Sequence, residues 1–71
     1  MIEFMLEYYS SGCLCRRLLK RADGFESPPV SEVILLDNKS YKVEWIVKIW
    51  EWDKERTTQV YCKKYVYPDD N

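Results

Sequence analysis

Residues 41–52 constrain the fold most, because every second side chain from Tyr41 to Ile49 is apolar and charged side chains lie between many of them. Successive side chains of a β-strand point to opposite faces, so this alternation predicts a strand. We assign one set to the hydrophobic core: Tyr41, Val43, Trp45, Val47 and Ile49. The other set becomes apolar towards its end, at Ile46, Trp50 and Trp52, which favours a sheet that curls or is covered.

Shorter β-favouring segments flank this strand. Residues 33–36 are an apolar run, and the following Asp37 and Asn38 favour a tight turn, so we expect a hairpin. Residues 57–67 are rich in Tyr, Val and Thr and end before Pro68. The prediction is therefore a three-strand meander over residues 30–67, followed by a solvated tail over residues 68–71. Either face of the last strand fits the core, and a bulge would exchange the two.

The side chains of the first nine residues also follow a two-residue period. Ile2, Phe4 and Leu6 share one side, and the acids Glu3 and Glu7 share the other, as in a half-buried strand. We predict a strand over residues 1–9. A helix stays open as the alternative, because the segment is apolar enough to satisfy either period, and the pairing of this strand with the meander is also left open.

Residues 12–23 show the clearest helical period in the chain. An apolar stripe recurs at the spacing of one helix face and consists of Cys15, Leu18, Leu19 and Ala22. The basic residues of the opposite face are Arg16, Arg17, Lys20 and Arg21. Ser10 or Ser11 provides an N-cap, and Gly24 provides a stop. We therefore predict an α+β fold in which one amphipathic helix packs on a small antiparallel sheet, and curling of this sheet into a half-barrel is left open.

The composition limits size and chemistry. A chain of 71 residues has room for one hydrophobic core, so residues 1–71 are taken as a single domain. The chain has no His and only two Gly, which removes the commonest general base and the glycine-rich nucleotide motifs. We expect no enzymatic activity, no catalytic residues and no cofactor.

The three cysteines are assigned as reduced thiols. Cys13 and Cys15 are too close in sequence for a usual disulfide, and with Cys62 they form an odd set. Their spacing differs from that of structural zinc sites, so we expect no metal. Cys15 and Cys62 suit the core, whereas Cys13 at the start of the predicted helix is the one candidate for a reactive thiol. The chain lacks an apolar run of about 20 residues and a signal-like start, so we expect a cytoplasmic protein without membrane contact.

Two groups of residues are candidate binding sites. The first is the basic face of the predicted helix, for which a merely solvated face is the stronger interpretation. The second is a surface of rings and cations on the strands: Trp50, Tyr61, Lys63, Tyr65 and Tyr67.

Our leading hypothesis is a non-enzymatic interaction protein, of the inhibitor or adaptor type. It would bind another protein, or itself, through an aromatic sheet face, because the chain carries many rings for its length and a net charge of only −1. The alternative is a single-stranded nucleic-acid or RNA binding module that uses the basic helix face and the Tyr and Lys strand face. A third hypothesis is a small ligand held in a curled sheet lined by Trp45 and Trp50.

Overall fold

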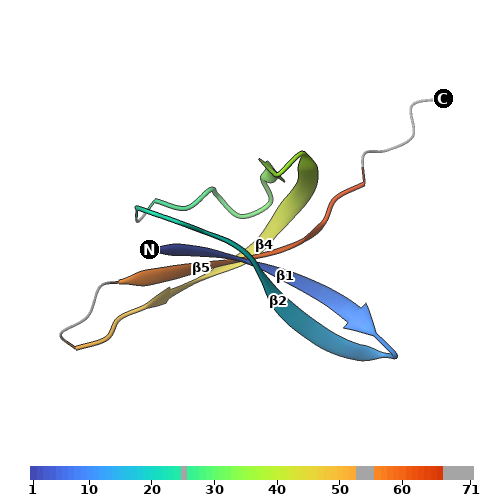
Figure 1. Ribbon diagram of the computed structural model, residues 1–71, viewed down its shortest axis with the longest axis horizontal. Coiled ribbons are helices and arrows are strands. Elements are labelled where there is room, and N and C mark those ends of the chain that lie inside the picture. Colours follow the sequence, from blue (N-terminus) through green and yellow to red (C-terminus); the bar gives the residue numbers. More distant parts are fainter. Residues whose placement is uncertain (25, 53–55, 67–71) are drawn as a thin grey trace.

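The chain folds into one five-stranded mixed sheet (Figure 1). The computed structural model describes residues 1–24, 26–52 and 56–66. The strands are β1 (Ile2–Ser10), β2 (Cys13–Ala22), β3 (Val33–Leu36), β4 (Lys39–Ile49) and β5 (Thr57–Lys64). Their order across the sheet is β2-β1-β5-β4-β3. The pairing of β1 with β5 is parallel, and all other neighbouring strands are antiparallel.

The predicted helix over residues 12–23 is wrong, and so is the α+β fold class. These residues form β2, which pairs antiparallel with β1 from Ser10 opposite Cys13 to Ile2 opposite Ala22. Ser11 and Gly12 have positive φ values of 52° and 78°, as a two-residue hairpin turn of type I′ requires. The described residues contain no helix, and therefore none that is long and apolar enough to cross a membrane.

Tertiary pairing explains why β2 is extended despite its helical period. A helix of about ten residues is marginal in water unless its apolar stripe is packed. In β2, by contrast, the backbone groups that face β1 join a ladder with it, and Arg16 and Arg21 reach the carboxylates of Glu7 and Glu3. An irregularity in the β1–β2 register at Leu19 turns this leucine towards the core, where it packs on a buried cluster.

The core lies on one face of the sheet, here called the core face. The fully buried side chains are Val43, Val60 and Cys62, from the two central antiparallel strands β4 and β5. Ile2 and Leu6 of β1 complete two adjoining clusters with them. Partly buried side chains pack against these clusters: Phe4, Leu19, Ile34, Leu36 and Ile46.

The sheet is curled over this core. Leu19 comes from one edge strand, β2, and Ile34 and Leu36 come from the other, β3, yet all three pack on the same buried cluster. An ion pair of 3.6 Å between Lys20 in β2 and Asp37 in the β3–β4 turn also joins the two edges. Figure 1 shows the strong twist that accompanies this curl.

A bulge in β4 makes the second half of this strand turn its side chains to the faces opposite to those predicted. Val43 lies opposite Cys62, but Trp45 lies opposite Tyr61, so Glu44 is the extra residue. Tyr41 and Val43 are buried as predicted, whereas the assignment of Trp45, Val47 and Ile49 to the core is wrong. Beyond the bulge Ile46 takes the core position opposite Val60.

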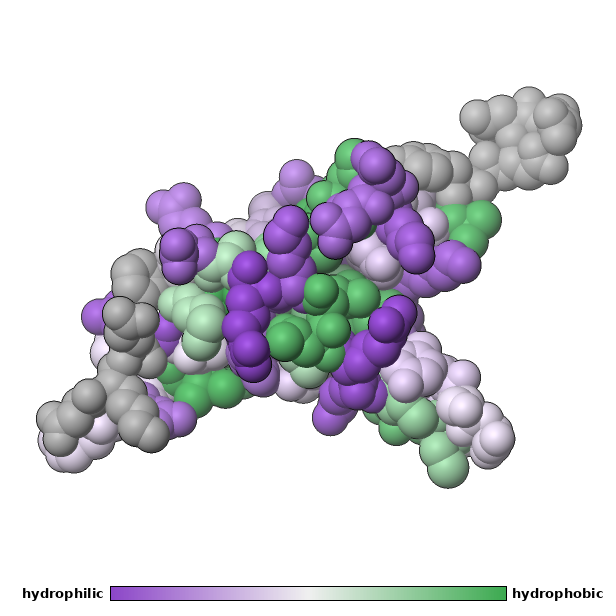
Figure 2. Space-filling view, viewed as in Figure 1, coloured by the Kyte–Doolittle hydropathy of each residue, from purple (hydrophilic) through white to green (hydrophobic). Residues whose placement is uncertain are grey.

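The edges of the sheet are protected from pairing with another chain. The edge strand β3 is only four residues long. The other edge strand, β2, carries four basic residues: Arg16, Arg17, Lys20 and Arg21. Charged and short edge strands are common protections against edge-to-edge association. A single sheet nevertheless leaves apolar surface exposed. Figure 2 shows hydrophobic side chains in the middle of this view with hydrophilic ones on both sides.

The core assignment predicts that Val60→Ala destabilises the protein strongly. Val60 is 0% exposed, and the cavity left by its two methyl groups should lower the free energy of unfolding by about 2 kcal/mol. Denaturant unfolding measures this loss. The control is Val66→Ala, because Val66 is 77% exposed and its truncation should change the free energy by less than about 0.5 kcal/mol. Equal effects of the two substitutions would contradict the core described above.

Candidate functional site

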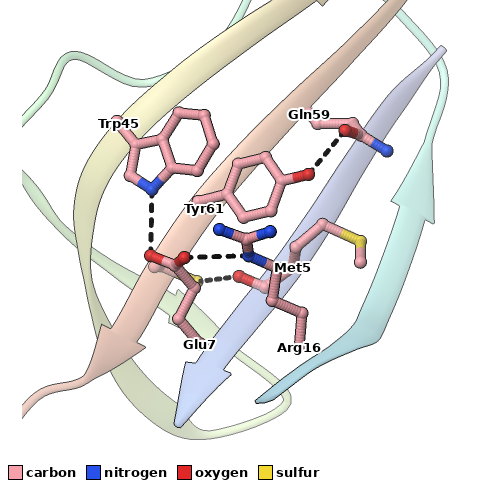
Figure 3. A network of polar contacts seen from close by, with 7 residues as sticks. Met5, Glu7, Arg16, Trp45, Gln59 and Tyr61 are labelled. Carbon is pink, nitrogen blue, oxygen red and sulfur yellow. Dashed lines mark hydrogen bonds and ion pairs between the residues drawn. The ribbon is translucent and has the colours of Figure 1, made fainter. Parts of the chain in front are cut away.

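The face opposite the core carries a network of polar and aromatic side chains, here called the aromatic face (Figure 3). Four neighbouring strands each contribute one central residue: Arg16 from β2, Glu7 from β1, Tyr61 from β5 and Trp45 from β4. Cross-strand register places them together, because Arg16 lies opposite Glu7 and Tyr61 opposite Trp45. The bulge at Glu44 is what turns Trp45 to this face.

Glu7 holds the centre of the network. One carboxylate oxygen, Oε2, accepts a hydrogen bond of 3.0 Å from Arg16 Nε, and the other, Oε1, accepts one of 2.9 Å from Trp45 Nε1 (Figure 3). The Glu7 residue is only 7% exposed. A buried carboxylate is stable only when it is hydrogen-bonded and paired, and here both oxygens have partners.

The ring of Trp45 is stacked on the ring of Tyr61. Their centroids are 4.1 Å apart, and the planes differ by 6°. The guanidinium carbon of Arg16 lies 5.6 Å from the Trp45 ring centre and 5.2 Å from that of Tyr61, within the range of cation–π attraction. The indole is therefore fixed by a hydrogen bond, a stack and a cation, while Trp45 remains 38% exposed.

A second carboxylate extends the network along β1. Glu3 accepts hydrogen bonds from Arg21 Nε at 3.0 Å and from Gln59 Nε2 at 3.1 Å. Gln59 in turn accepts one of 2.7 Å from the hydroxyl of Tyr61. The hydrogen bond from Gln59, followed by that from Arg21, lowers the pKa of Glu3 below its ordinary value of 4.5. Among the described residues, every buried side-chain nitrogen and oxygen has a partner.

The four basic residues predicted to share one helix face are separated by the sheet. Arg16 and Arg21 lie on the aromatic face, where each pairs with a glutamate of β1. Arg17 lies opposite Leu6, and Lys20 lies opposite Phe4, so both belong to the core face. Because these residues form a strand, the predicted basic helix face is absent, and a binding role for the individual cations stays a prediction.

The predicted surface of rings and cations is also divided. Tyr61 is 8% exposed within the network, and Lys63 forms an ion pair of 3.8 Å with Glu44. Trp50 lies beyond the end of β4, 68% exposed, with the Arg56 guanidinium carbon 3.9 Å from its ring centre. Tyr65 follows β5 and lines a hollow at one end of the core face. Tyr67 lies outside the described residues.

Sequence reasoning missed the two glutamates that organise the aromatic face. Glu3 and Glu7 stand on the same side of the alternating segment 1–9, and this was the available signal. Acidic residues are by default assigned to the solvent, so their side of the strand was taken as exposed. Arg21 and Arg16 on the neighbouring strand supply the counter-charges that allow Glu3 to be partly buried and Glu7 to be buried.

The cysteines contribute no chemistry to this face. Cys62 is fully buried on the core face, and its thiol lies 3.3 Å from the carbonyl oxygen of Met5. Burial, with a smaller contribution from the charge of Glu7, raises the pKa of Cys62 to about 11, so the thiol stays protonated at neutral pH. Cys13 is exposed, but it begins a strand, so the predicted activation by a helix start does not apply.

Comparison of the chain with models of known protein families, with curated proteins and with solved structures finds no match.

The double role of Glu7 predicts that Glu7→Gln destabilises the protein. A glutamine oxygen can still accept the Trp45 hydrogen bond, but its amide group would face Arg16 and cannot accept from it. Because Arg16 is 46% exposed and can turn to water, we expect a loss of about 1 to 2 kcal/mol in the free energy of unfolding. Denaturant unfolding monitored by tryptophan fluorescence checks this, and Glu32→Gln on an exposed residue is the control. Equal stability of wild type and Glu7→Gln would contradict the network.

The lowered pKa of Glu3 predicts a specific pH dependence. The ionised form is favoured in the folded state, so its stabilising effect is complete above the unfolded pKa of about 4.5 and is lost as pH falls through the lower folded pKa. Wild type should therefore be more stable than Glu3→Gln at about pH 6. The difference should shrink as the pH is lowered towards about 3. Thermal unfolding at several pH values measures it, and a difference independent of pH would be inconsistent with these contacts.

Proposed function

We propose that the protein is a non-enzymatic interaction module, of the inhibitor or adaptor type, that binds another protein or a second copy of itself through the aromatic face. The observation that carries this proposal is Trp45. Its indole is held in one orientation by Glu7, Tyr61 and Arg16, yet it is partly exposed on a face over which no described element forms a second layer.

The side-chain types at the centre of this face support protein binding. Trp, Tyr and Arg are the residues most enriched among those that contribute most to protein–protein affinity. Large rings that are already immobile lose little conformational entropy on binding, which leaves more of the contact energy available for affinity. Here the immobilising contacts come from inside the protein, so they are present before any partner arrives.

The surroundings of Trp45 match the usual anatomy of an interface. Leu18 lies on the same face, opposite Met5, and is 38% exposed. Val47 and Ile49 lie on this face beyond Trp45 and are partly exposed. Two ion pairs border the apolar centre: Arg21 with Glu3, and Lys63 with Glu44. An apolar centre with a polar rim is the arrangement that protein interfaces show.

The edges of the sheet favour a face over an edge as the contact surface. Antiparallel pairing of β2 with a second β2 would bring the same four cations together, which is unfavourable. β3 offers only four residues for pairing. Association by extension of the sheet is therefore the weaker route, and the aromatic face is the favoured contact surface.

The proposal predicts that Trp45→Ala and Leu18→Glu weaken partner binding by at least about tenfold, as loss of a central interface residue does. Tagged wild type and variants would be used to recover partners from the source cell, followed by affinity measurement with each purified partner. Leu18→Glu places a charge on the aromatic face at a residue that is not a partner of Glu7 or Trp45 in the network. Trp52→Ala is the control, because Trp52 is 95% exposed and lies past the end of β4.

Self-association is measured in parallel by sedimentation equilibrium of purified protein. Under the proposal, either a recovered protein or the dimer depends on Trp45 and Leu18 but not on Trp52. A protein that stays monomeric at high concentration, and whose recovered partners are indifferent to Trp45 and Leu18, would overturn the proposal.

A further inference from the structure

A hollow of about 380 Å³ opens at one end of the core face. Leu6 and Tyr41, two members of a buried cluster, contribute apolar and aromatic surface to its lining. Ser40 and Tyr65 also line it and are joined by a hydrogen bond of 3.0 Å from the Tyr65 amide to the Ser40 carbonyl. The volume is within the range of pockets that hold small molecules, roughly 300 to 1,000 Å³.

Three cations from three strands line the same hollow: Arg17 of β2, Lys39 of β4 and Lys64 of β5. The register explains their convergence. Arg17 lies opposite Leu6, Lys64 lies opposite Tyr41, and Lys39 precedes Tyr41 by two residues on the same face. The lining contains no Asp or Glu.

These cations differ from the other basic residues of β2. Arg16, Lys20 and Arg21 each have a carboxylate partner. Over residues 1–24, 26–52 and 56–66, by contrast, no ion pair is formed by Arg17, Lys39 or Lys64. Like charges brought together without a counter-charge repel one another, and low-dielectric walls strengthen the resulting field. The fold thus maintains an uncompensated positive site beside an apolar surface.

We infer that this hollow is a binding site for a phosphate group carried by an organic molecule. A phosphate ester has up to two negative charges, and a diphosphate has more, which matches three cations better than a single carboxylate does. Arg17 offers a planar fork that suits two phosphate oxygens, and the two lysines act as point charges. The rings of Tyr41 and Tyr65 and the side chain of Leu6 would contact the organic part.

The phosphate can come from a free small molecule or from the backbone of a single-stranded nucleic acid, and the two sources share this chemistry. A strand would add further contacts beyond the hollow, so its affinity would exceed that of a mononucleotide and fall steeply with salt. A free phosphate compound would fill the hollow alone. The site lies on the core face, so it is independent of the partner proposed for the aromatic face.

The test is calorimetric titration of the full chain with three probes: inorganic pyrophosphate, adenosine monophosphate and a ten-nucleotide oligothymidylate. The inference predicts saturable binding of at least one probe. Arg17→Gln and Lys64→Gln should each weaken that binding by about tenfold, as loss of a charged hydrogen-bonding partner does. The control Lys42→Gln removes the same charge from an exposed position of β4 outside the hollow and should change the affinity less than about twofold.

Each outcome is decisive. Saturation by pyrophosphate or the mononucleotide, with sensitivity to Arg17 and Lys64, supports a free phosphate compound, whereas binding of the oligothymidylate alone supports a strand. No saturable binding of any probe, or equal weakening by Lys42→Gln, would overturn the site.

The unfolding temperature of each variant without phosphate separates a loss of binding from a loss of folding. Because the three cations repel one another, Arg17→Gln and Lys64→Gln should leave the unfolding temperature in the absence of phosphate unchanged or raise it. A marked fall would mean that the cations support the fold, and would count against a site kept for a ligand.

Discussion

The parallel pairing of β1 with β5 is the contact on which the rest of the structure depends. It joins residues far apart in the chain, with Ile2 opposite Thr58 and Leu6 opposite Cys62. It is reinforced at its start by hydrogen bonds from the Thr58 amide to the Met1 carbonyl, and from the amino group of Met1 to the Arg56 carbonyl. Without this pairing, the β1–β2 hairpin would be an isolated two-stranded unit, which is marginal in water, and the β3–β4–β5 meander would lose Ile2 and Leu6 from its core clusters.

This pairing creates both surfaces of the sheet at once. On one face it brings Ile2 and Leu6 against the buried residues of β4 and β5, and it sets Arg17 at the rim of the cationic hollow. On the other face it brings the two glutamates of β1 beside Gln59 and Tyr61. The two register irregularities refine the result, because one turns Leu19 into the core and the other turns Trp45 out of it.

The local alternation of the sequence was informative where a strand has one regular face. Ile2, Val43 and Tyr41 are buried where the alternation placed them, and the Asp37–Asn38 turn joins β3 to β4 with positive φ at both residues. The spacing of apolar residues led to the wrong prediction of a helix for residues 13–22, because the same spacing is also compatible with a bulged strand. The Ser11–Gly12 pair has two readings, as a helix start or as a hairpin turn, and only the partner strand decides between them.

The candidate surfaces were less predictable than the strands. A bulge changes the face of every residue that follows it, so the exposure of Trp45 depended on one extra residue, Glu44, that local sequence does not mark. The burial of Glu7 depended on Arg16 and Trp45, which lie on two other strands. The cationic hollow combines residues from four strands, and its three cations are not adjacent in sequence.

The most direct measurement of the central claim is the pattern of inter-strand nuclear Overhauser effects between β1 and β5. The parallel pairing predicts contacts between backbone protons of Glu3 and Gln59 and of Met5 and Tyr61, together with extended-strand chemical shifts over residues 13–22. Absence of the β1–β5 contacts, or helical shifts over residues 13–22, would contradict the sheet and with it both proposed surfaces.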